Sequence, residues 1–240
     1  MTKAIKAAVA PVLILILMAG MVAAQERLPQ VVKKPSPTYQ EPTGPAKVLY
    51  EQANKFWEAE DFAKAAEVYK KITRLRPDDF VAYSQLGWAY SFLGRDHDAL
   101  TAFKEAVRLR PDFAPLHEVL GRAYNILHRR EEAIEAFKQA IRLDPDKAES
   151  HSGLGQAYWG LATDLGNRGG QFDKVMPIFK QAGTAFKQAV RLKPNDATAH
   201  FGLGMFYLIL GDRGAALEEY KILQSLDKEQ ANVLFNSIYK

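Results

Sequence analysis

Residues 80–113 read FVAYSQLGWAYSFLGRDHDALTAFKEAVRLRPDF, and the next 34 residues, 114–147, read APLHEVLGRAYNILHRREEAIEAFKQAIRLDPDK. Both segments carry a Leu-Gly pair in the first third, an Ala and a Phe in the second half, and a proline at the thirty-second position. Repetition at this period indicates stacked supersecondary units, each of which buries its apolar face against its neighbours.

The same pattern extends over five segments when the proline is taken as position 32. Small residues occupy position 8 (Ala53, Gly87, Gly121, Gly155, Gly204) and alanine always occupies position 20 (Ala65, Ala99, Ala133, Ala182, Ala216). Aromatic residues occupy position 11 (Phe56, Tyr90, Tyr124, Tyr158, Tyr207) and position 24 (Tyr69, Phe103, Phe137, Phe186, Tyr220). Spacings of three and four residues predict two amphipathic helices in each segment, so each unit is a helical hairpin.

The local signals agree with such hairpins. Small residues at positions 8 and 20 let the two helices approach, and the rings at positions 11 and 24 fill the space beside them. Left-handed turn residues are expected at Gly94, His128 and Gly211. The next first helix is expected to be capped by the residue after the proline, which is Asp78, Asp112, Asp146 or Asn195.

These residues resemble the tetratricopeptide repeat family from Ala46 to about Lys228, with repeats at about 46–79, 80–113, 114–147, 148–196 and 197–230. The resemblance implies an all-α solenoid of antiparallel helix pairs in a right-handed superhelix. It also implies that the first helices line a concave groove that usually receives peptides. Residues 231–240 are predicted to form a capping helix, in which Leu234, Phe235 and Ile238 cover the end of the stack.

The fourth repeat has 15 extra residues between Tyr158 and Ala182. Apolar residues 161 and 165 continue the first helix, and residues 172, 175 and 179 extend the second, which places the turn at 166–170. Pro177 is predicted either to lie in the first turn of the second helix or to kink it. The segment therefore predicts a hairpin that projects from the stack, as a partner contact or as a tolerated insertion.

Positions 5, 9 and 12 of the first helices form the stripe that faces the groove in this family. The predicted peptide-binding residues are Tyr50, Asn54, Trp57, Ser84, Trp88, Ser91, Glu118, Arg122, Asn125, Ser152, Gln156 and Trp159. Aromatic area beside amide and guanidinium donors suits an extended peptide. The alternative is that each tryptophan packs against a neighbouring helix. Of the residues with which some members hold a terminal carboxylate, only Asn54 is present, so an acidic chaperone tail is not expected.

The sequence predicts no enzyme, no cofactor and no metal site. The absence of cysteine excludes disulfides, thiolate nucleophiles and cysteine metal sites. The Gly-Leu-Gly segments at 153–155 and 202–204 lack the strand and the Lys-Ser/Thr of a phosphate loop, so they are interpreted as packing glycines. His117, His151 and His200 recur at position 4, which favours a repeat position over a zinc site.

The amino-terminal residues predict export. Residues 1–24 combine Lys3 and Lys6 with an apolar run from Val9 to about Met18 and small residues before Gln25, which is the pattern of a secretory signal peptide. The run is shorter than the roughly 20 residues of a spanning helix, and an uncleaved membrane anchor is the alternative. We expect a bacterial periplasmic or secreted protein with no membrane span after cleavage.

Residues 25–45 contain five prolines and predict a semi-rigid linker, or alternatively a proline-rich ligand. Without Lys3 and Lys6 the chain has 30 basic and 28 acidic residues, too even a balance for a nucleic-acid binder.

Two functional hypotheses follow. The first is an exported adaptor, scaffold or assembly factor of the cell envelope that binds a protein or peptide partner in its groove. The second is a structural envelope protein that self-associates through the fourth-repeat hairpin or the terminal helix.

Overall fold

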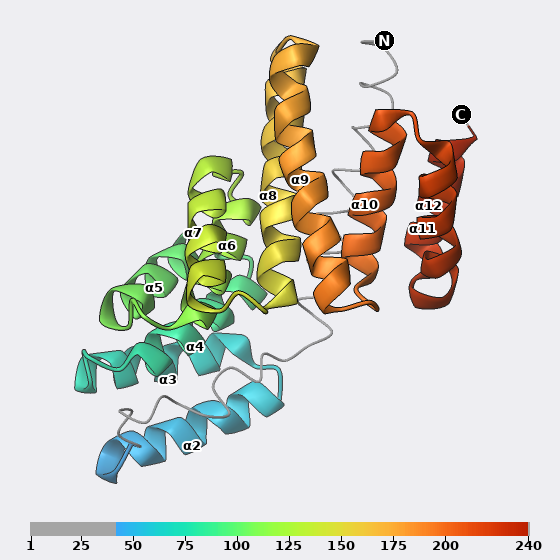
Figure 1. Cartoon of the computed structure of the whole chain (residues 1–240). Helices are drawn as coiled ribbons and strands as arrows, with labels where there is room; N and C mark the ends of the chain where they lie inside the picture. The colour runs from blue at the N-terminus through green and yellow to red at the C-terminus, as the bar shows by residue number, and fades with distance from the viewer. Residues whose placement is uncertain (1–41, 240) are drawn as a thin grey trace.

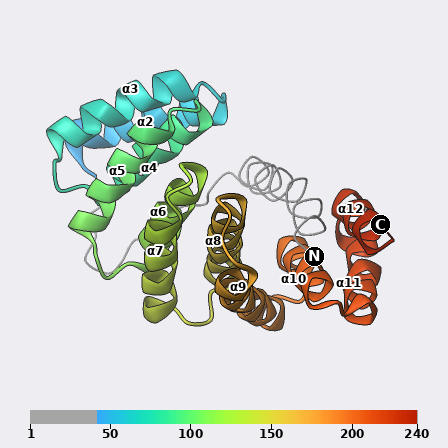
Figure 2. The ribbon, with the colours of Figure 1, turned by 90° about the horizontal axis from the view of Figure 1, so that it is seen from above.

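The computed structural model describes residues 42–239, in which all regular secondary structure is helical. The helices are α2 (Gly44–Glu58), α3 (Phe62–Leu75), α4 (Phe80–Phe92), α5 (Asp96–Leu109), α6 (Ala114–Ile126), α7 (Arg130–Leu143), α8 (Ala148–Asn167), α9 (Phe172–Leu192), α10 (Ala197–Leu210), α11 (Arg213–Leu226) and α12 (Lys228–Ile238). They form five antiparallel pairs followed by the single helix α12 (Figure 1). The pairs follow a curve, and in its middle α6 and α8 lie on the inner side and α7 and α9 on the outer side (Figure 2).

The amino-terminal predictions lie largely outside the described residues. The predicted signal peptide, residues 1–24, and the linker up to residue 41 are in that part of the chain. Helix α2 begins at Gly44 with Pro45 in its first turn, so the last two residues of the predicted linker belong to the first hairpin. A proline is favourable there, because the first amide groups of a helix have no intrahelical acceptor.

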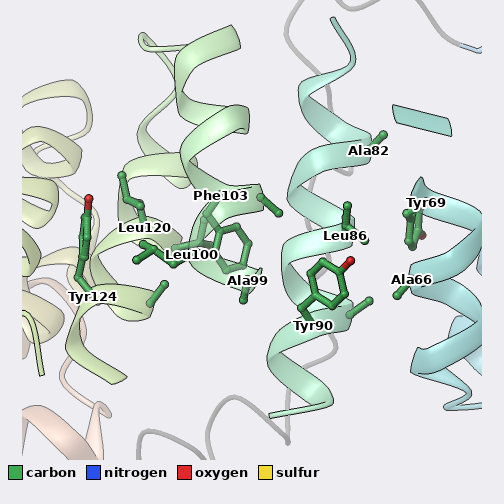
Figure 3. Packing of buried hydrophobic residues seen from close by; sticks show 14 of the residues in the cluster. Ala66, Tyr69, Ala82, Leu86, Tyr90, Ala99, Leu100, Phe103, Leu120 and Tyr124 are labelled. Carbon is green, nitrogen blue, oxygen red and sulfur yellow. The ribbon is translucent and has the colours of Figure 1, made fainter. Parts of the chain in front are cut away.

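The core is built from rings at position 24 that lie against glycines at position 8. A Cβ atom on Gly87 would lie 2.6 Å from the Phe103 ring, so no other residue fits without a shift. Phe186 packs against two repeats, because a Cβ atom on Gly155 would lie 2.7 Å from its ring and one on Gly202 would lie 2.6 Å from it. Figure 3 shows the buried side chains of α3 to α6 in a continuous layer, with Phe103 between α5 and α4. The third and fourth repeats therefore bury their rings, Phe137 and Phe186, partly against the following repeat.

The turn residues confirm one local prediction and correct another. Gly94, His128 and Gly211 have φ values of 68°, 58° and 80°, in the left-handed region that ends each first helix. The predicted caps at Asp78 and its equivalents are wrong by one residue, because the first helices start at the third residue after the proline. Asp79 caps α4, and its Oδ1 accepts from the amides of Val81 (3.1 Å) and Ala82 (3.2 Å).

The recurring histidines fasten consecutive helices. The Nε2 atoms of His117, His151 and His200 lie 2.8, 2.8 and 2.9 Å from the carbonyl oxygens of Pro111, Pro145 and Pro194. Each ring thus donates to the proline carbonyl that follows the preceding helix, a group that a helix end leaves unpaired. Within residues 42–239, no group of three or more His, Asp and Glu residues is placed to hold a metal ion.

The fourth hairpin is longer than the others. Helices α8 and α9 have 20 and 21 residues, and their joined ends project beyond α7 and α10 (Figure 1). The turn is shorter than predicted, since α8 continues through Asn167 and α9 begins at Phe172. Pro177 lies inside α9, past its first turn, so both extensions are helical up to the tip of the hairpin.

The terminal helix begins three residues earlier than predicted. Asp227 is its cap, and its Oδ1 accepts from the amides of Glu229 and Gln230, both at 3.0 Å. Leu234 and Ile238 are buried against the last repeat as expected, whereas Phe235 is 40% exposed. Among the helices of the described part of the chain, none has the length and hydropathy to cross a bilayer.

Candidate peptide-binding surface

The predicted stripe, which we call the inner stripe, divides into an open part and a buried part. Seven of its side chains are exposed or partly exposed: Tyr50, Asn54, Trp57, Trp88, Ser91, Arg122 and Gln156. Five are buried: Ser84, Glu118, Asn125, Ser152 and Trp159. A ligand on the surface of this structure can therefore contact the first group directly.

Trp159 is a core residue of the fourth hairpin. It is 1% exposed, and its ring meets Phe179 edge to face at 4.8 Å. Ala162 and Val175, both from the inserted residues, belong to the same buried cluster. The insertion thus covers this tryptophan, and no ligand reaches its ring in this structure. For Trp159 the alternative interpretation, that the tryptophan packs against a neighbouring helix and does not face a ligand, is therefore confirmed.

The other two tryptophans are packed on one side and open on the other. The Trp88 ring lies 5.6 Å from that of Phe103, and Trp57 lies against Phe62 (5.3 Å) and Phe92 (5.7 Å). Phe62 and Phe92 are themselves stacked at 4.4 Å with an interplanar angle of 12°. We call Trp57, Phe62 and Phe92 the aromatic cluster. Its two phenylalanines were not predicted from the sequence, because they stand at helix ends, outside the repeating positions.

Position 9 supplies the polar centre of the surface. In four consecutive repeats it holds Asn54, Trp88, Arg122 and Gln156, none of them fully buried. Arg122 Nη2 lies 2.9 Å from Glu118 Oε1, and the arginine side chain remains 38% exposed. This contact orients the guanidinium on its own helix and leaves other N–H groups free to donate. The four side chains thus combine amide and guanidinium donors with an aromatic face.

Arg130, which was not predicted from the sequence either, fastens the projecting hairpin to the third repeat. The side chain is 4% exposed, and its Nε lies 3.1 Å from Asp164 Oδ2 in the extended part of α8. Its Nη1 donates to the Asn125 carbonyl at 3.0 Å, and its Nη2 to His128 Nδ1 at 2.8 Å. The guanidinium passes Gly160, where a Cβ atom would lie 2.7 Å from Nε. That glycine, aligned with larger residues in the other repeats, was the available signal.

A second ion pair joins the fourth and fifth repeats. Lys193 Nζ lies 2.9 Å from Glu149 Oε1, and both side chains are 27% exposed. Burial alone would raise the pKa of Glu149, but the hydrogen bond from Lys193 and the nearby Lys147 outweigh it and lower the pKa to about 2. The carboxylate is therefore ionised in any neutral buffer, and the pair holds α8 against the turn after α9.

We expect the fifth repeat to lose stability as pH rises through the neutral range. Both ring nitrogens of His200 face acceptors, the Pro194 carbonyl and Glu219 Oε2 at 2.6 Å. Burial lowers the pKa of His200, but the Glu219 and Pro194 hydrogen bonds outweigh it and raise the pKa above its usual value. The stabilisation is fully present below about pH 6.5 and is lost above the folded-state pKa.

Thermal unfolding between about pH 6 and pH 9 checks this expectation. Glu219→Gln should flatten the decline of the melting temperature with pH, because a neutral amide does not favour the imidazolium. His151→Gln is the matched control, since His151 makes the same proline contact. A decline as steep in Glu219→Gln as in the parent would contradict the assignment.

Comparison with known proteins identifies the repeat. The family described as "Tetratricopeptide repeat" matches residues 50–114 and 179–231, and the family described as "TPR repeat" matches residues 121–161. A search of curated protein sequences found no match.

Three similar solved structures support the same fold. MamA from Desulfovibrio magneticus RS-1 has a TM-score of 0.65 and 21% identity, covering 77% of this chain and 96% of that one. YrrB, described as a TPR protein with an unusual peptide-binding site, has a TM-score of 0.63 and 19% identity, with coverages of 81% and 92%. TTC0263, described as a thermophilic TPR protein in Thermus thermophilus, has a TM-score of 0.57 and 20% identity, with coverages of 81% and 100%. With its matched repeats and its five stacked hairpins, the chain belongs to the tetratricopeptide repeat family and is an α-solenoid of antiparallel helix pairs.

Proposed function

We propose that this chain is an exported protein-interaction module that binds an extended peptide segment along the open part of its inner stripe. The observation that carries the proposal is that position 9 of four consecutive first helices holds Asn54, Trp88, Arg122 and Gln156, none of them buried. An extended main chain presents donors and acceptors at regular intervals, which amide and guanidinium side chains complement while an aromatic face contributes apolar area.

The proposal places the protein in the cell envelope as an adaptor, scaffold or assembly factor. Its support is the sequence of residues 1–24, which has the three parts of a secretory signal peptide. Native protein is then expected to begin at Gln25, as read by mass spectrometry of its amino terminus. The peptide-binding site that the description of YrrB mentions is a second support, from a protein of similar fold.

The test compares two triple variants in partner binding. In the groove variant, Asn54, Arg122 and Gln156 are replaced by alanine; in the outer variant, the exposed Lys71, Lys180 and Gln181 of α3 and α9 are replaced in the same way. Partners are captured from the native envelope fraction, identified, and titrated with each purified protein. We expect the groove variant to bind about tenfold more weakly or worse, because truncating a central contact costs about 1 kcal/mol or more.

The outer variant should bind like the parent, and both variants should give the parental circular dichroism spectrum. None of the six side chains is buried, so neither variant is expected to unfold. The groove variant also leaves Glu118 without its Arg122 partner, so its melting temperature is compared with that of the parent before binding is measured. Equal affinity of the groove variant and the parent for every captured protein would refute binding at the inner stripe. Tryptophan substitutions are less suitable, because Trp159 belongs to the core.

The alternative function is self-association through the projecting hairpin or the terminal helix. Exposed apolar side chains favour it at both places: Leu165 (37%) and Phe172 (42%) on the hairpin, and Phe235 (40%) and Tyr239 (65%) at the terminus. Size-exclusion chromatography with light scattering separates the two functions. A monomer at micromolar concentration supports the module, whereas an oligomer that Phe172→Ser or Tyr239→Ser dissolves supports the alternative.

A further inference from the structure

The aromatic cluster lies partly open at the turn end of the first hairpin. Its three rings, Trp57, Phe62 and Phe92, touch one another, yet each remains partly exposed. The neighbouring Leu93 is 39% exposed. The cluster therefore presents a continuous apolar area at the amino-terminal end of the inner stripe, beside Asn54.

The fourth repeat contains the same pair of residues in a covered form. Trp159 and Phe179 align with Trp57 and Phe62 when the tryptophans are counted from the small residues at position 8 and the phenylalanines from the alanines at position 20. Both pairs meet edge to face, at 4.8 Å and 5.3 Å. In the fourth repeat the inserted residues cover the pair, and both rings are 2% exposed or less. The first repeat has no insertion, so its pair lacks this cover within the described residues.

The chain carries a candidate cover immediately before α2. Residues 25–41, outside the described part, contain Pro29, Pro35 and Pro37, and Pro42 follows at the start of the structure. Proline-rich segments favour the polyproline II conformation. Because this conformation is already formed, the proline rings can dock on aromatic side chains with little further loss of conformational entropy.

The reach of this segment matches the position of the cluster. Trp57 lies about 20 Å along α2 from Gly44, at about 1.5 Å per residue. A polyproline II segment advances about 3.1 Å per residue, so about six or seven residues counted back from Pro42 span that distance. That count ends at Pro35-Ser36-Pro37.

Charge also favours this alignment. Lys33 and Lys34 precede Pro35 in the sequence. With Pro35 on the aromatic cluster, these lysines come to the turn after α2, where Glu58 and Glu60 are exposed. Opposite charges at this spacing add a modest attraction and fix the direction of the segment antiparallel to α2.

We propose that Pro35-Ser36-Pro37 of the same chain docks on the aromatic cluster and occupies the amino-terminal end of the inner stripe until a partner displaces it. The docking itself is argued only from the aromatic cluster and the proline-rich segment. Displacement of the segment by a partner rests on the proposed function. Because the segment is tethered to α2, its effective concentration is about millimolar, which populates a contact too weak to persist between separate molecules.

The experiment follows Trp57 in the intact chain by fluorine NMR after incorporation of 5-fluorotryptophan. The three tryptophans give three resonances, and Trp57→Phe assigns the one in question. Pro35→Gly combined with Pro37→Gly should shift this resonance and at least double the acrylamide quenching of Trp57, while the buried Trp159 stays constant as an internal reference. Pro29→Gly is the matched control in the same segment and should leave Trp57 unchanged.

Addition in trans measures the contact itself. A synthetic peptide of residues 30–42 should restore the parental Trp57 resonance in the double variant only at about millimolar concentration, the effective concentration of the tether. An unchanged Trp57 resonance in the double variant would overturn the proposal. So would a parental resonance that changes on tenfold dilution, because the contact would then come from a second copy.

The two proposals fail separately. If the groove variant loses its partner while the Trp57 resonance is unchanged in the double proline variant, only the docking is refuted. If Trp57 responds but the groove variant keeps its partner, the proposed function falls and the docking stands. If both hold, the double variant should bind the partner more tightly than the parent does, since no segment has to be displaced.

Discussion

The Phe137→Ala variant is expected to lose about 3–5 kcal/mol of the free energy of unfolding, the range measured for buried phenylalanines. The ring is fully buried, and a Cβ atom on Gly121 would lie 3.0 Å from it. On its other side it lies against Gly153 of the following repeat. Two glycines have no side chains with which to fill the space, so the cavity cannot collapse cheaply, and the loss weakens two repeats together.

Urea denaturation followed by circular dichroism measures this effect. Phe172→Ala is the matched control, because Phe172 is 42% exposed on the projecting hairpin, and its replacement should cost about 0.5 kcal/mol or less. If Phe137→Ala unfolds at the same urea concentration as this control, the shared ring does not hold the third and fourth repeats together.

The Arg130→Met variant is expected to lose about 2–3 kcal/mol and to loosen the projecting hairpin. Removing one partner of a buried ion pair costs about 3–5 kcal/mol, and the 29% exposure of Asp164 reduces that figure because water can solvate the carboxylate left behind. The Asn125 carbonyl also loses its donor. Hydrogen exchange of residues 161–177 should therefore accelerate more than exchange in α2 to α5.

Arg129→Met is the control for that substitution. Arg129 is the neighbouring residue, pairs with Glu132 on the exposed outer side, and has 42% of its side chain exposed. Its replacement should change the free energy of unfolding by about 0.5 kcal/mol or less. Equal exchange rates for residues 161–177 in the two variants would show that the hairpin does not depend on Arg130.

The fold was predictable because the repeat encodes it redundantly. Glycine at position 8 and a ring at position 24 recur together, so the contact of Gly87 with Phe103 predicts that of Gly155 with Phe186. Boundaries were less predictable where two polar residues compete to cap a helix. Asp79, and not Asp78, caps α4, a choice that depends on which backbone amides the carboxylate reaches after folding.

The candidate site was only half predictable, because repeat position does not determine burial where a repeat is irregular. Trp57 and Trp159 hold the same position, yet the insertion covers only the second. The ion pair of Arg130 could not be predicted from the sequence for a related reason. Its partner Asp164 lies in residues that no other repeat possesses, so no periodic signal marked the pair.

The terminal helix closes the carboxyl-terminal end of the stack. In the fifth repeat a Cβ atom on Gly204 would meet Leu234 of α12 at 2.6 Å, and Tyr220 packs instead on Phe235 at 5.3 Å. The last repeat therefore packs against a helix that is not part of a repeat. Another hairpin packed on this repeat in the same way would have to displace Leu234 and the rest of α12. The surface that a following repeat would use is thus already occupied at the carboxyl-terminal end of the described helices.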